Sequence, residues 1–164
     1  MRKRIFKKIK LSDLDLIVYD FDGVMTDNRV LVLDNGREAV FCNRSDGLAV
    51  GLIRKQGVRQ IILSTEENSV VSARAKKLKL ECIQGVADKK KALRNYCENK
   101  KYNFAKVLYI GNDLNDLEVM KGVGFPVAPS DACAEIKKIA KLILPQKGGK
   151  GVLRGLLKYV EVDL

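Results

Sequence analysis

The 164-residue sequence contains no histidine, and this absence narrows its chemistry. Without histidine the chain can form no Ser-His triad, no phosphohistidine and no histidine metal ligand. Its four cysteines stand far apart and form no Cys-x-x-Cys pair, so neither a zinc ribbon nor a dithiol redox motif is indicated, and reduced thiols in the cytosol are expected. Any catalytic chemistry is therefore expected to depend on carboxylates.

The sequence also lacks long apolar runs, and aromatic residues make up only 6% of it. Residues 1–10 are basic and too polar for a signal peptide, and no later stretch could span a bilayer, so a cytoplasmic protein with no membrane association is expected. The formal net charge of +11 favours anionic ligands, although it also fits a plainly solvated surface. Because the lysines are spread through predicted helices and aromatics are few, nucleic-acid binding is not indicated as a principal role.

Short apolar runs alternate with amphipathic stretches along the chain. Strands are expected near residues 15–20, 58–63, 81–84, 106–110, 124–128 and 141–144. Helices are expected near residues 46–56, 67–79, 88–100, 114–121, 131–140 and 149–160, with amino-terminal caps at Ser45 or Asp46, Asn68, Asp88 and Ser130. The alternation predicts one α/β domain over residues 1–164, a Rossmann-like three-layer sandwich with a central parallel sheet.

Residues 29–43 break this alternation, because they form two β-rich arms around Asn35 and Gly36. Asn-Gly is a strong signal for the tight turn of a hairpin, since both residues tolerate positive φ. A hairpin that projects from an α/β core exposes its edges unless it pairs with another chain. The apolar content of the arms favours an oligomerisation element over a simple surface flap.

In residues 16–27 an apolar strand ends in two acids, a glycine and a threonine. A carboxylate at the carboxyl end of a buried strand, here Asp20, can act as a nucleophile toward phosphorus. Asp22 points the same way if the chain stays extended, and it can protonate a leaving oxygen and then activate water. Two crowded acids need a hard cation such as Mg²⁺ to attract a phosphate, and Gly23 lets the backbone pass close to that phosphate. A strand end followed by a polar turn explains this short pattern equally well, so the choice between the two interpretations depends on other segments of the chain.

Residues 20–27 resemble the first motif of haloacid dehalogenase (HAD) superfamily phosphatases, and the other three motifs follow in the expected order. Ser64, after the apolar run 61–63, matches the hydroxyl that bonds the transferring phosphoryl group. Lys89 matches the cation that offsets developing negative charge. Residues 107–116 match the fourth motif, which delivers acidic metal ligands. No segment between the motifs is long enough for a cap domain, so the resemblance implies a capless HAD fold.

One position departs from the family pattern. Asn112 stands where the superfamily usually has Asp, directly after the glycine of the fourth motif. An amide oxygen can bind Mg²⁺ but brings no negative charge, so metal affinity is expected to fall unless Asp113 takes the place. The resemblance implies a metal site made by Asp20, the carbonyl of Asp22, and Asn112 or Asp113. Asp116 is expected to anchor the third-motif lysine or a metal-bound water rather than the ion.

Within the superfamily, the chain from Asp20 to Arg154 resembles capless phosphatases of 2-keto-3-deoxy sugar acids. These act on the 8-phosphate of KDO or the 9-phosphates of KDN and sialic acid, in lipopolysaccharide and sialic acid biosynthesis. The resemblance implies a homotetramer whose hairpins form a central barrel and whose neighbouring chains help to close the site. Besides the hairpin, the supporting segments are residues 43–47, 73–78, 85–89 and 148–154.

Similarity to the nonulosonate branch of these enzymes also suggests substrate-binding residues. It points to Glu66 and Lys77 near the phosphate, with Arg74 beside them as a bidentate partner for the sugar-acid carboxylate. Thr26 of the first motif is a further candidate. Without the resemblance, Glu66 is a charge at a helix start and Lys77 a solvated helix residue.

Two functions compete at this point. One is a Mg²⁺-dependent phosphatase that cleaves a terminal phosphomonoester through an aspartyl-phosphate. The other is a weakly active or inactive oligomerisation module beside a CMP-sialic acid cytidylyltransferase, because residues 20–27 and 111–116 also resemble domains that accompany those enzymes. The phosphatase is favoured because the chain keeps the whole candidate set, namely Asp20, Asp22, Ser64 and Lys89.

Overall fold

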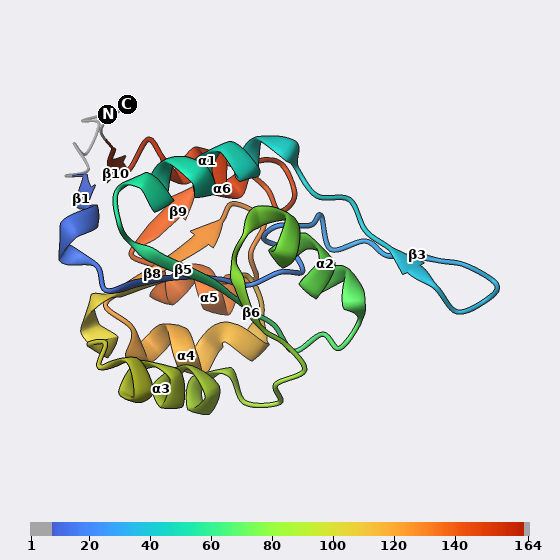
Figure 1. The fold of residues 1–164 in the computed structure, drawn as a ribbon, viewed down its shortest axis with the longest axis horizontal. Coiled ribbons are helices and arrows are strands. Elements are labelled where there is room, and N and C mark those ends of the chain that lie inside the picture. Colours follow the sequence, from blue (N-terminus) through green and yellow to red (C-terminus); the bar gives the residue numbers. More distant parts are fainter. Residues whose placement is uncertain (1–7, 163–164) are drawn as a thin grey trace.

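A parallel sheet of six strands forms the centre of the structure, a computed structural model that describes residues 8–162 (Figure 1). The order across the sheet is β6-β5-β2-β7-β8-β9, and every neighbouring pair is parallel. The α/β fold with a central parallel sheet is thus confirmed. The strands are β2 (Leu16–Tyr19), β5 (Arg59–Leu63), β6 (Glu81–Ile83), β7 (Val107–Ile110), β8 (Phe125–Pro129) and β9 (Leu142–Leu144).

Strand β2 lies between β5 and β7 in the middle of the sheet. All four of its side chains are fully buried, as expected of a continuous apolar strand that is covered on both faces. From β2 the chain builds outward through β5 and β6, then returns to the other side of β2 through β7. Ligands of open α/β sheets bind beyond the carboxyl ends of the strands at such a reversal, so the fold itself marks the end of β2.

Helices cover both faces of the sheet (Figure 1). One apolar cluster includes α1 (Arg44–Lys55), α2 (Ser69–Leu78) and α6 (Val152–Leu156). The other includes α3 (Lys89–Lys100), α4 (Leu117–Gly122) and α5 (Ala134–Ile139). Three 3₁₀ turns complete the helical elements of the described chain: η1 (Leu11–Asp13), η2 (Phe104–Lys106) and η3 (Leu114–Asp116). Within residues 8–162, no helix has the length and apolar character needed to cross a membrane.

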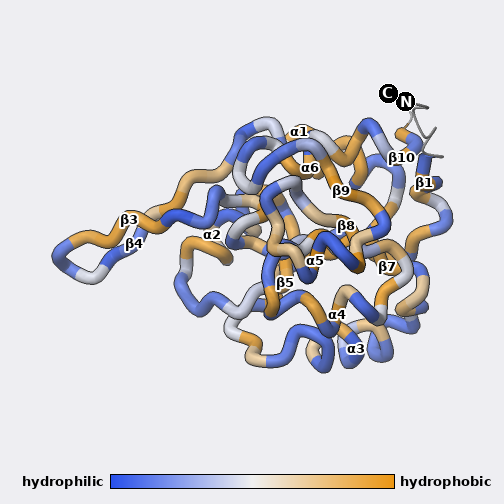
Figure 2. Tube along the Cα trace, turned by 180° about the vertical axis from the view of Figure 1, so that it is seen from behind, coloured by the Kyte–Doolittle hydropathy of each residue, from blue (hydrophilic) through white to orange (hydrophobic). Residues whose placement is uncertain are grey.

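The predicted hairpin is present as β3 (Leu31–Val32) and β4 (Glu38–Ala39), and it projects from the body of the molecule (Figure 1). Gly36 sits at its turn with φ of 78°, a backbone conformation that favours glycine. Hydrophobic stretches run along the arms (Figure 2), and the side chain of Phe41 is 70% exposed. Much apolar surface of the hairpin thus stays open to solvent in the described chain.

Two of the predicted amino-terminal caps are confirmed, since Asn68 caps α2 and Asp88 caps α3. The other two are wrong. Helix α1 begins earlier than expected because Asn43 accepts the N–H of Ser45, so neither Ser45 nor Asp46 is the cap. Ser130 is not a cap either, because α5 begins only at Ala134.

The helix predicted over residues 149–160 is too long. Gly149 and Gly151 adopt positive φ of 68° and 83°, which ends any regular helix there, and α6 starts only after them. The chain then forms β10 (Val160–Glu161), which pairs in parallel with β1 (Ile9–Lys10). The helix predicted over residues 114–121 starts as η3 and continues as α4. The basic residues 2–7 noted in the sequence lie outside the described residues.

Asp46 joins α1 to α6 through a buried carboxylate. Its Oδ1 accepts the N–H of Arg154 at 3.0 Å, but its Oδ2 is buried with no hydrogen-bond partner in residues 8–162. Burial raises the pKa of this carboxyl from 3.8 to about 6. A raised folded-state pKa means that the unfolded state loses the proton first, so the stability from this residue falls as pH rises from about 4 to about 6.

Asp46→Asn is therefore expected to stabilise the protein at neutral pH, by about 1–3 kcal/mol. The amide oxygen can keep the Arg154 contact while the buried charge is removed. Urea unfolding of both proteins between pH 4 and pH 8 measures the difference. It should be small at pH 4 and reach its full value above pH 6; a difference that is constant with pH would show that Asp46 does not titrate in this window.

Candidate active site

Four segments that are distant in sequence meet where the central strands end. Asp20 directly follows β2, Ser64 follows β5, and Asn112 follows β7 after one glycine. Lys89 opens α3 after the loop that leaves β6. The carboxyl ends of parallel strands share one edge of a sheet, so the strand order places these residues together (Figure 1).

Lys89 forms a buried ion-pair network at this edge. Its Nζ lies 2.8 Å from Asp20 Oδ1 and 2.7 Å from Asp116 Oδ1, and its side chain is only 1% exposed. Burial alone would lower the pKa of Lys89, but the two carboxylates raise it above its usual value. Burial and the charge of Asp116 raise the pKa of Asp20, while Lys89 opposes this rise. The lysine is thus a fixed positive charge that holds the Asp20 carboxylate in place.

Asp116 is the structural anchor of this network. It is fully buried; its Oδ1 accepts the Tyr109 hydroxyl at 2.7 Å and its Oδ2 accepts the Asn112 N–H at 2.8 Å. A Cβ at Gly111 would lie 2.6 Å from Asp116 Cγ, so only glycine allows this close approach. The expectation that Asp116 anchors Lys89 is confirmed. Tyr109 supports the same network, but no sequence pattern indicates it, because it stands within an apolar strand.

The loop after β2 is held by Thr26. The fully buried Thr26 hydroxyl accepts the N–H groups of Gly23 and Asn28, and it lies 3.4 Å from Asp22 Oδ1 as a donor. Because this hydroxyl is buried and occupied, Thr26 positions Asp22 and is not placed to contact substrate. Burial and the neighbouring charge of Glu66 raise the pKa of Asp22, which favours a carboxyl that carries a proton to donate.

Two oxygen-bearing groups, the Asp22 carbonyl and the Asn112 amide, lie beside the Asp20 carboxylate, and the three together suit a divalent cation. One terminal atom of the Asn112 amide lies 2.9 Å from the Asp22 carbonyl oxygen and 3.2 Å from Asp20 Oδ2. Both neighbours are acceptors, so the amide nitrogen would face them in the absence of a cation. With a cation bound, the amide oxygen would complete a set of three hard oxygen ligands.

Asp113, the alternative ligand, is used differently. It is exposed, and its carboxylate accepts the Leu114 N–H at 2.8 Å in a capping box at the start of η3. Residues 8–162 hold no group of three or more acidic, cysteine or histidine side chains that could bind a metal. A cation held at this edge would use the Asp20 carboxylate with the Asp22 carbonyl and the Asn112 amide, and the geometry favours Asn112 over Asp113.

Asn112→Asp should tighten Mg²⁺ binding by about tenfold, because it adds one negative charge to the same oxygen set. Asp113→Asn is the matched control, since it removes a charge one residue away and should change the affinity little. The Mg²⁺ dependence of phosphate release measures both. An equal effect of the two variants would show that Asn112 is not the ligand.

Ser64 is buried, and its Oγ accepts the N–H of Glu66 at 3.1 Å. The hydroxyl hydrogen is therefore left to donate to a phosphoryl oxygen, as the second motif requires. Glu66 itself accepts the N–H groups of Glu67 and Asn68 at 2.8 Å each. Glu66 thus lies beside Ser64, at a place that we call the mouth of the site, and its charge also raises the pKa of Asp22.

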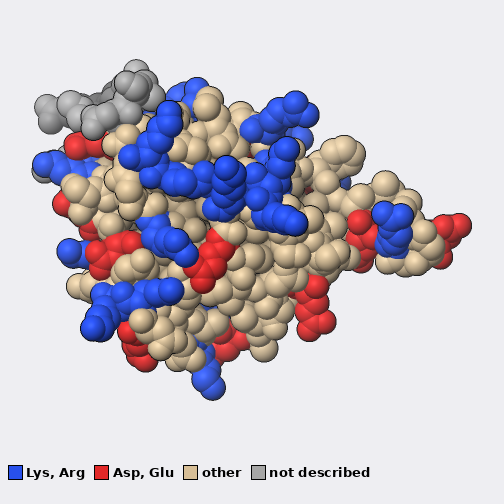
Figure 3. All heavy atoms as spheres, viewed as in Figure 1, with Lys and Arg blue, Asp and Glu red and all other residues tan. Residues whose placement is uncertain are grey.

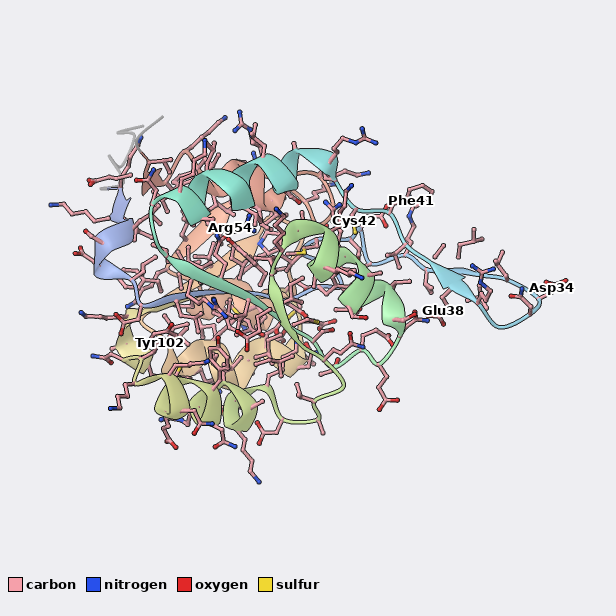
Figure 4. The ribbon with its side chains drawn as sticks, in the orientation of Figure 1. Asp34, Glu38, Phe41, Cys42, Arg54 and Tyr102 are labelled. Atoms are coloured by element: carbon pink, nitrogen blue, oxygen red, sulfur yellow. The ribbon has the colours of Figure 1, made fainter. Side chains whose placement is uncertain are left out.

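Glu38, a residue of the hairpin, also lies at the mouth of the site. Its side chain lies beside the start of α2, whereas Asp34 lies at the tip of the hairpin (Figure 4). Glu38 Oε2 accepts the Asn68 side-chain amide at 3.0 Å, and its charge also raises the pKa of Asp22. No pattern in the sequence indicates this residue, because its role depends on the contact between the hairpin and the start of α2.

Arg74 and Lys77 lie elsewhere. Arg74 donates to the Asn43 carbonyl at 2.9 Å, and Lys77 is exposed on the last turn of α2. Both line a hollow of about 290 Å³ between α1 and α2 that contains Arg44, Arg54 and Lys79 and none of the catalytic candidates. Lys and Arg side chains gather on this face (Figure 3). Within one chain, the structure does not bring Arg74 or Lys77 to the catalytic cluster.

The comparisons with known proteins agree with this geometry. Residues 52–156 match the model of the haloacid dehalogenase-like hydrolase family. The chain is 29% identical over 146 residues to 3-deoxy-D-manno-octulosonate 8-phosphate phosphatase KdsC of Yersinia pestis, covering 88% of this chain and 78% of that protein. It is 26% identical to N-acylneuraminate cytidylyltransferase of Oncorhynchus mykiss, over 88% of this chain but only 34% of that protein.

Solved structures of HAD hydrolases are also similar to this chain. A HAD family hydrolase from Streptomyces avermitilis superposes with a TM-score of 0.90 at 41% identity, covering 93% of this chain and 88% of that one. The 3-deoxy-D-manno-octulosonate 8-phosphate phosphatase of Moraxella catarrhalis, solved with magnesium, phosphate and KDO, gives a TM-score of 0.86 at 26% identity, with 92% and 89% covered.

Proposed function

The chain belongs to the haloacid dehalogenase-like hydrolases, and we propose that it is a Mg²⁺-dependent phosphatase of a 2-keto-3-deoxy sugar acid phosphate. Its similarity to 8-phosphate phosphatases supports a phosphatase. The observation that carries the proposal is the buried Lys89, which holds the Asp20 carboxylate beside the oxygen set of Asp22 and Asn112.

We infer a reaction in two steps from these side chains. Asp20 attacks phosphorus, and the bond between phosphorus and the sugar oxygen breaks while Asp22 gives its proton to that oxygen. Asp22 then takes a proton from water, whose oxygen attacks the same phosphorus and frees Asp20 and inorganic phosphate. Ser64 and Lys89 hold the phosphoryl oxygens and offset their charge.

The residues present fit a magnesium ion, which Asp20, the Asp22 carbonyl and Asn112 would hold. When bound, such an ion neutralises phosphate charge and lets an anionic ester approach two carboxylates. The solved Moraxella catarrhalis relative was determined with magnesium, which supports this choice.

We further propose that the substrate is KDO 8-phosphate or a nonulosonate 9-phosphate of the KDN or N-acylneuraminate type. The named relatives act in both areas of sugar-acid chemistry. Glu66 and Glu38 present carboxylates at the mouth, where sugar hydroxyls can donate to them. The free cysteines fit a reducing compartment such as the cytoplasm.

The hairpin supports a homotetramer. Its apolar arms, with Phe41 70% exposed, are unusual for a monomer surface, and pairing with other chains would cover them. Neighbouring chains in such an assembly could supply the substrate contacts that Arg74 and Lys77 do not make within one chain.

A second function is a partner module for a cytidylyltransferase. It is favoured by the similarity to N-acylneuraminate cytidylyltransferases, of whose length this chain spans about a third (34% and 38%). The retained catalytic set weighs against an inactive module.

A substrate panel tests the proposal. KDO 8-phosphate, KDN 9-phosphate, N-acetylneuraminate 9-phosphate and p-nitrophenyl phosphate are assayed with and without Mg²⁺, with Asp20→Asn as the blank. One sugar-acid phosphate should exceed p-nitrophenyl phosphate in kcat/KM by roughly tenfold or more and require Mg²⁺. If phosphate is released from every compound no faster than in the blank, the phosphatase proposal is wrong and the partner-module function remains.

A further inference from the structure

A second cavity lies along α6, apart from the catalytic edge. Its volume is about 390 Å³, and its walls come from α1, α6, the loop before α6 and the chain ends near β1 and β10. None of Asp20, Asp22, Ser64, Lys89 or Asn112 lines it. The loop at residues 147–151 separates it from the catalytic loop, because Gly149 donates its N–H to the Val24 carbonyl on the other side.

Among the described residues, the charged side chains that line this cavity are all cations. Lys8, Lys150, Arg154 and Lys158 line it, and no acidic residue does so in the described chain. None of these four side chains forms a salt bridge within residues 8–162. Four cations around one concavity repel one another, and an anion placed between them would relieve that repulsion.

The cavity also has an apolar wall. Leu157 and Val162 contribute apolar surface. Gln146 lines the cavity as well, and its Oε1 is buried with no hydrogen-bond partner in the described chain. A Cβ at Gly155 would lie 2.0 Å from this oxygen, so glycine at 155 is what allows Gln146 to sit there. This oxygen is closed off by its packing against Gly155, so Gln146 shapes the cavity wall, and a ligand would meet the cations and the apolar residues.

We propose that this cavity is a second binding site, for a small organic anion. The ligand carries a phosphate, phosphonate or carboxylate group that Lys150, Arg154 and Lys158 hold, and an apolar part that packs on Leu157 and the β10 end. The combination matches ordinary small-molecule sites, which join mostly apolar walls to a few polar groups that fix orientation. This assignment does not depend on the sugar-acid phosphatase activity.

Phenylphosphonate and methylphosphonate test the site, because they share one anionic group and differ in apolar surface. The titrations use full-length Asp20→Asn protein without Mg²⁺, and amide NMR shifts locate the binding. Gly151 and Gly155 report on the cavity, whereas Gly23 and Gly111 report on the catalytic edge. Phenylphosphonate should shift the first pair saturably, with an affinity about tenfold above that of methylphosphonate.

Two charge variants make the assignment specific. Arg154→Gln should weaken phenylphosphonate binding at Gly151 and Gly155 by about tenfold, and Lys158→Gln should weaken it in the same direction. Only the backbone N–H of Arg154 contacts Asp46, so the substitution leaves that structural bond in place. Lys121→Gln, on the distant helix α4, is the control and should change nothing. No saturable shift at Gly151 and Gly155, or equal affinities in all three variants, would overturn the proposal.

Discussion

Replacing Asp20 by asparagine is expected to lower phosphate release by about 10⁴-fold or more, because the nucleophile that forms the covalent intermediate is lost. The variant keeps the shape of the side chain, and its amide can still contact Lys89. It should also fold at least as well as the parent, since it removes one of two buried carboxylates that crowd a single lysine.

The matched control is Asp34→Asn, because Asp34 lies at the tip of the projecting hairpin, away from the sheet edge (Figure 4). Both variants change one acid to its amide, so they share the same change in net charge. Phosphate release under saturating sugar-acid phosphate and Mg²⁺ compares them. Comparable residual activity in the two variants would remove Asp20 from the mechanism.

The second large effect is expected from Lys89→Met, which should destabilise the protein by about 3–5 kcal/mol. The reason is that Asp20 and Asp116 would remain buried without a positive partner. Activity should fall as well, by about 10²-fold or more, because the charge that offsets the phosphoryl oxygens is gone.

The loss of stability should depend on pH in a defined direction. Burial raises the pKa of Asp20 already in the parent, and loss of the lysine removes a contact that opposes this rise. The buried Asp20 carboxyl of the variant can therefore take up a proton as pH falls, and the penalty should shrink toward acidic pH. Lys91→Met, an exposed position on the same helix, is the control and should change stability little. Urea unfolding at pH 5 and pH 8 measures the loss of stability in both variants. A small loss for Lys89→Met that does not change with pH would contradict the buried network.

The catalytic edge could be predicted because its residues depend on local pattern. Asp20, Ser64 and Asn112 each follow a short apolar run, and parallel strands bring such strand ends to one edge whatever their separation in sequence. The amino-terminal caps at Asn68 and Asp88 are local too, since each side chain bonds a backbone N–H two or three residues away.

The features that could not be predicted depend on tertiary contacts and on backbone conformation. The role of Glu38 depends on the contact of its side chain with Asn68 at the start of α2, which no periodicity encodes. The shortening of the helix expected over residues 149–160 depends on positive φ at Gly149 and Gly151, and glycine permits this conformation without requiring it. The role of Thr26 could not be predicted either, because its hydroxyl accepts the N–H groups of Gly23 and Asn28 only once the loop is folded.

The central claim is that Asp20 becomes covalently bonded to phosphorus. An acid quench during turnover of ³²P-labelled substrate, followed by peptide mapping, measures this directly. Label should appear transiently on the peptide that contains Asp20 and be absent from the Asp20→Asn variant. Full turnover with no label on any carboxylate, or label on another residue, would contradict the account.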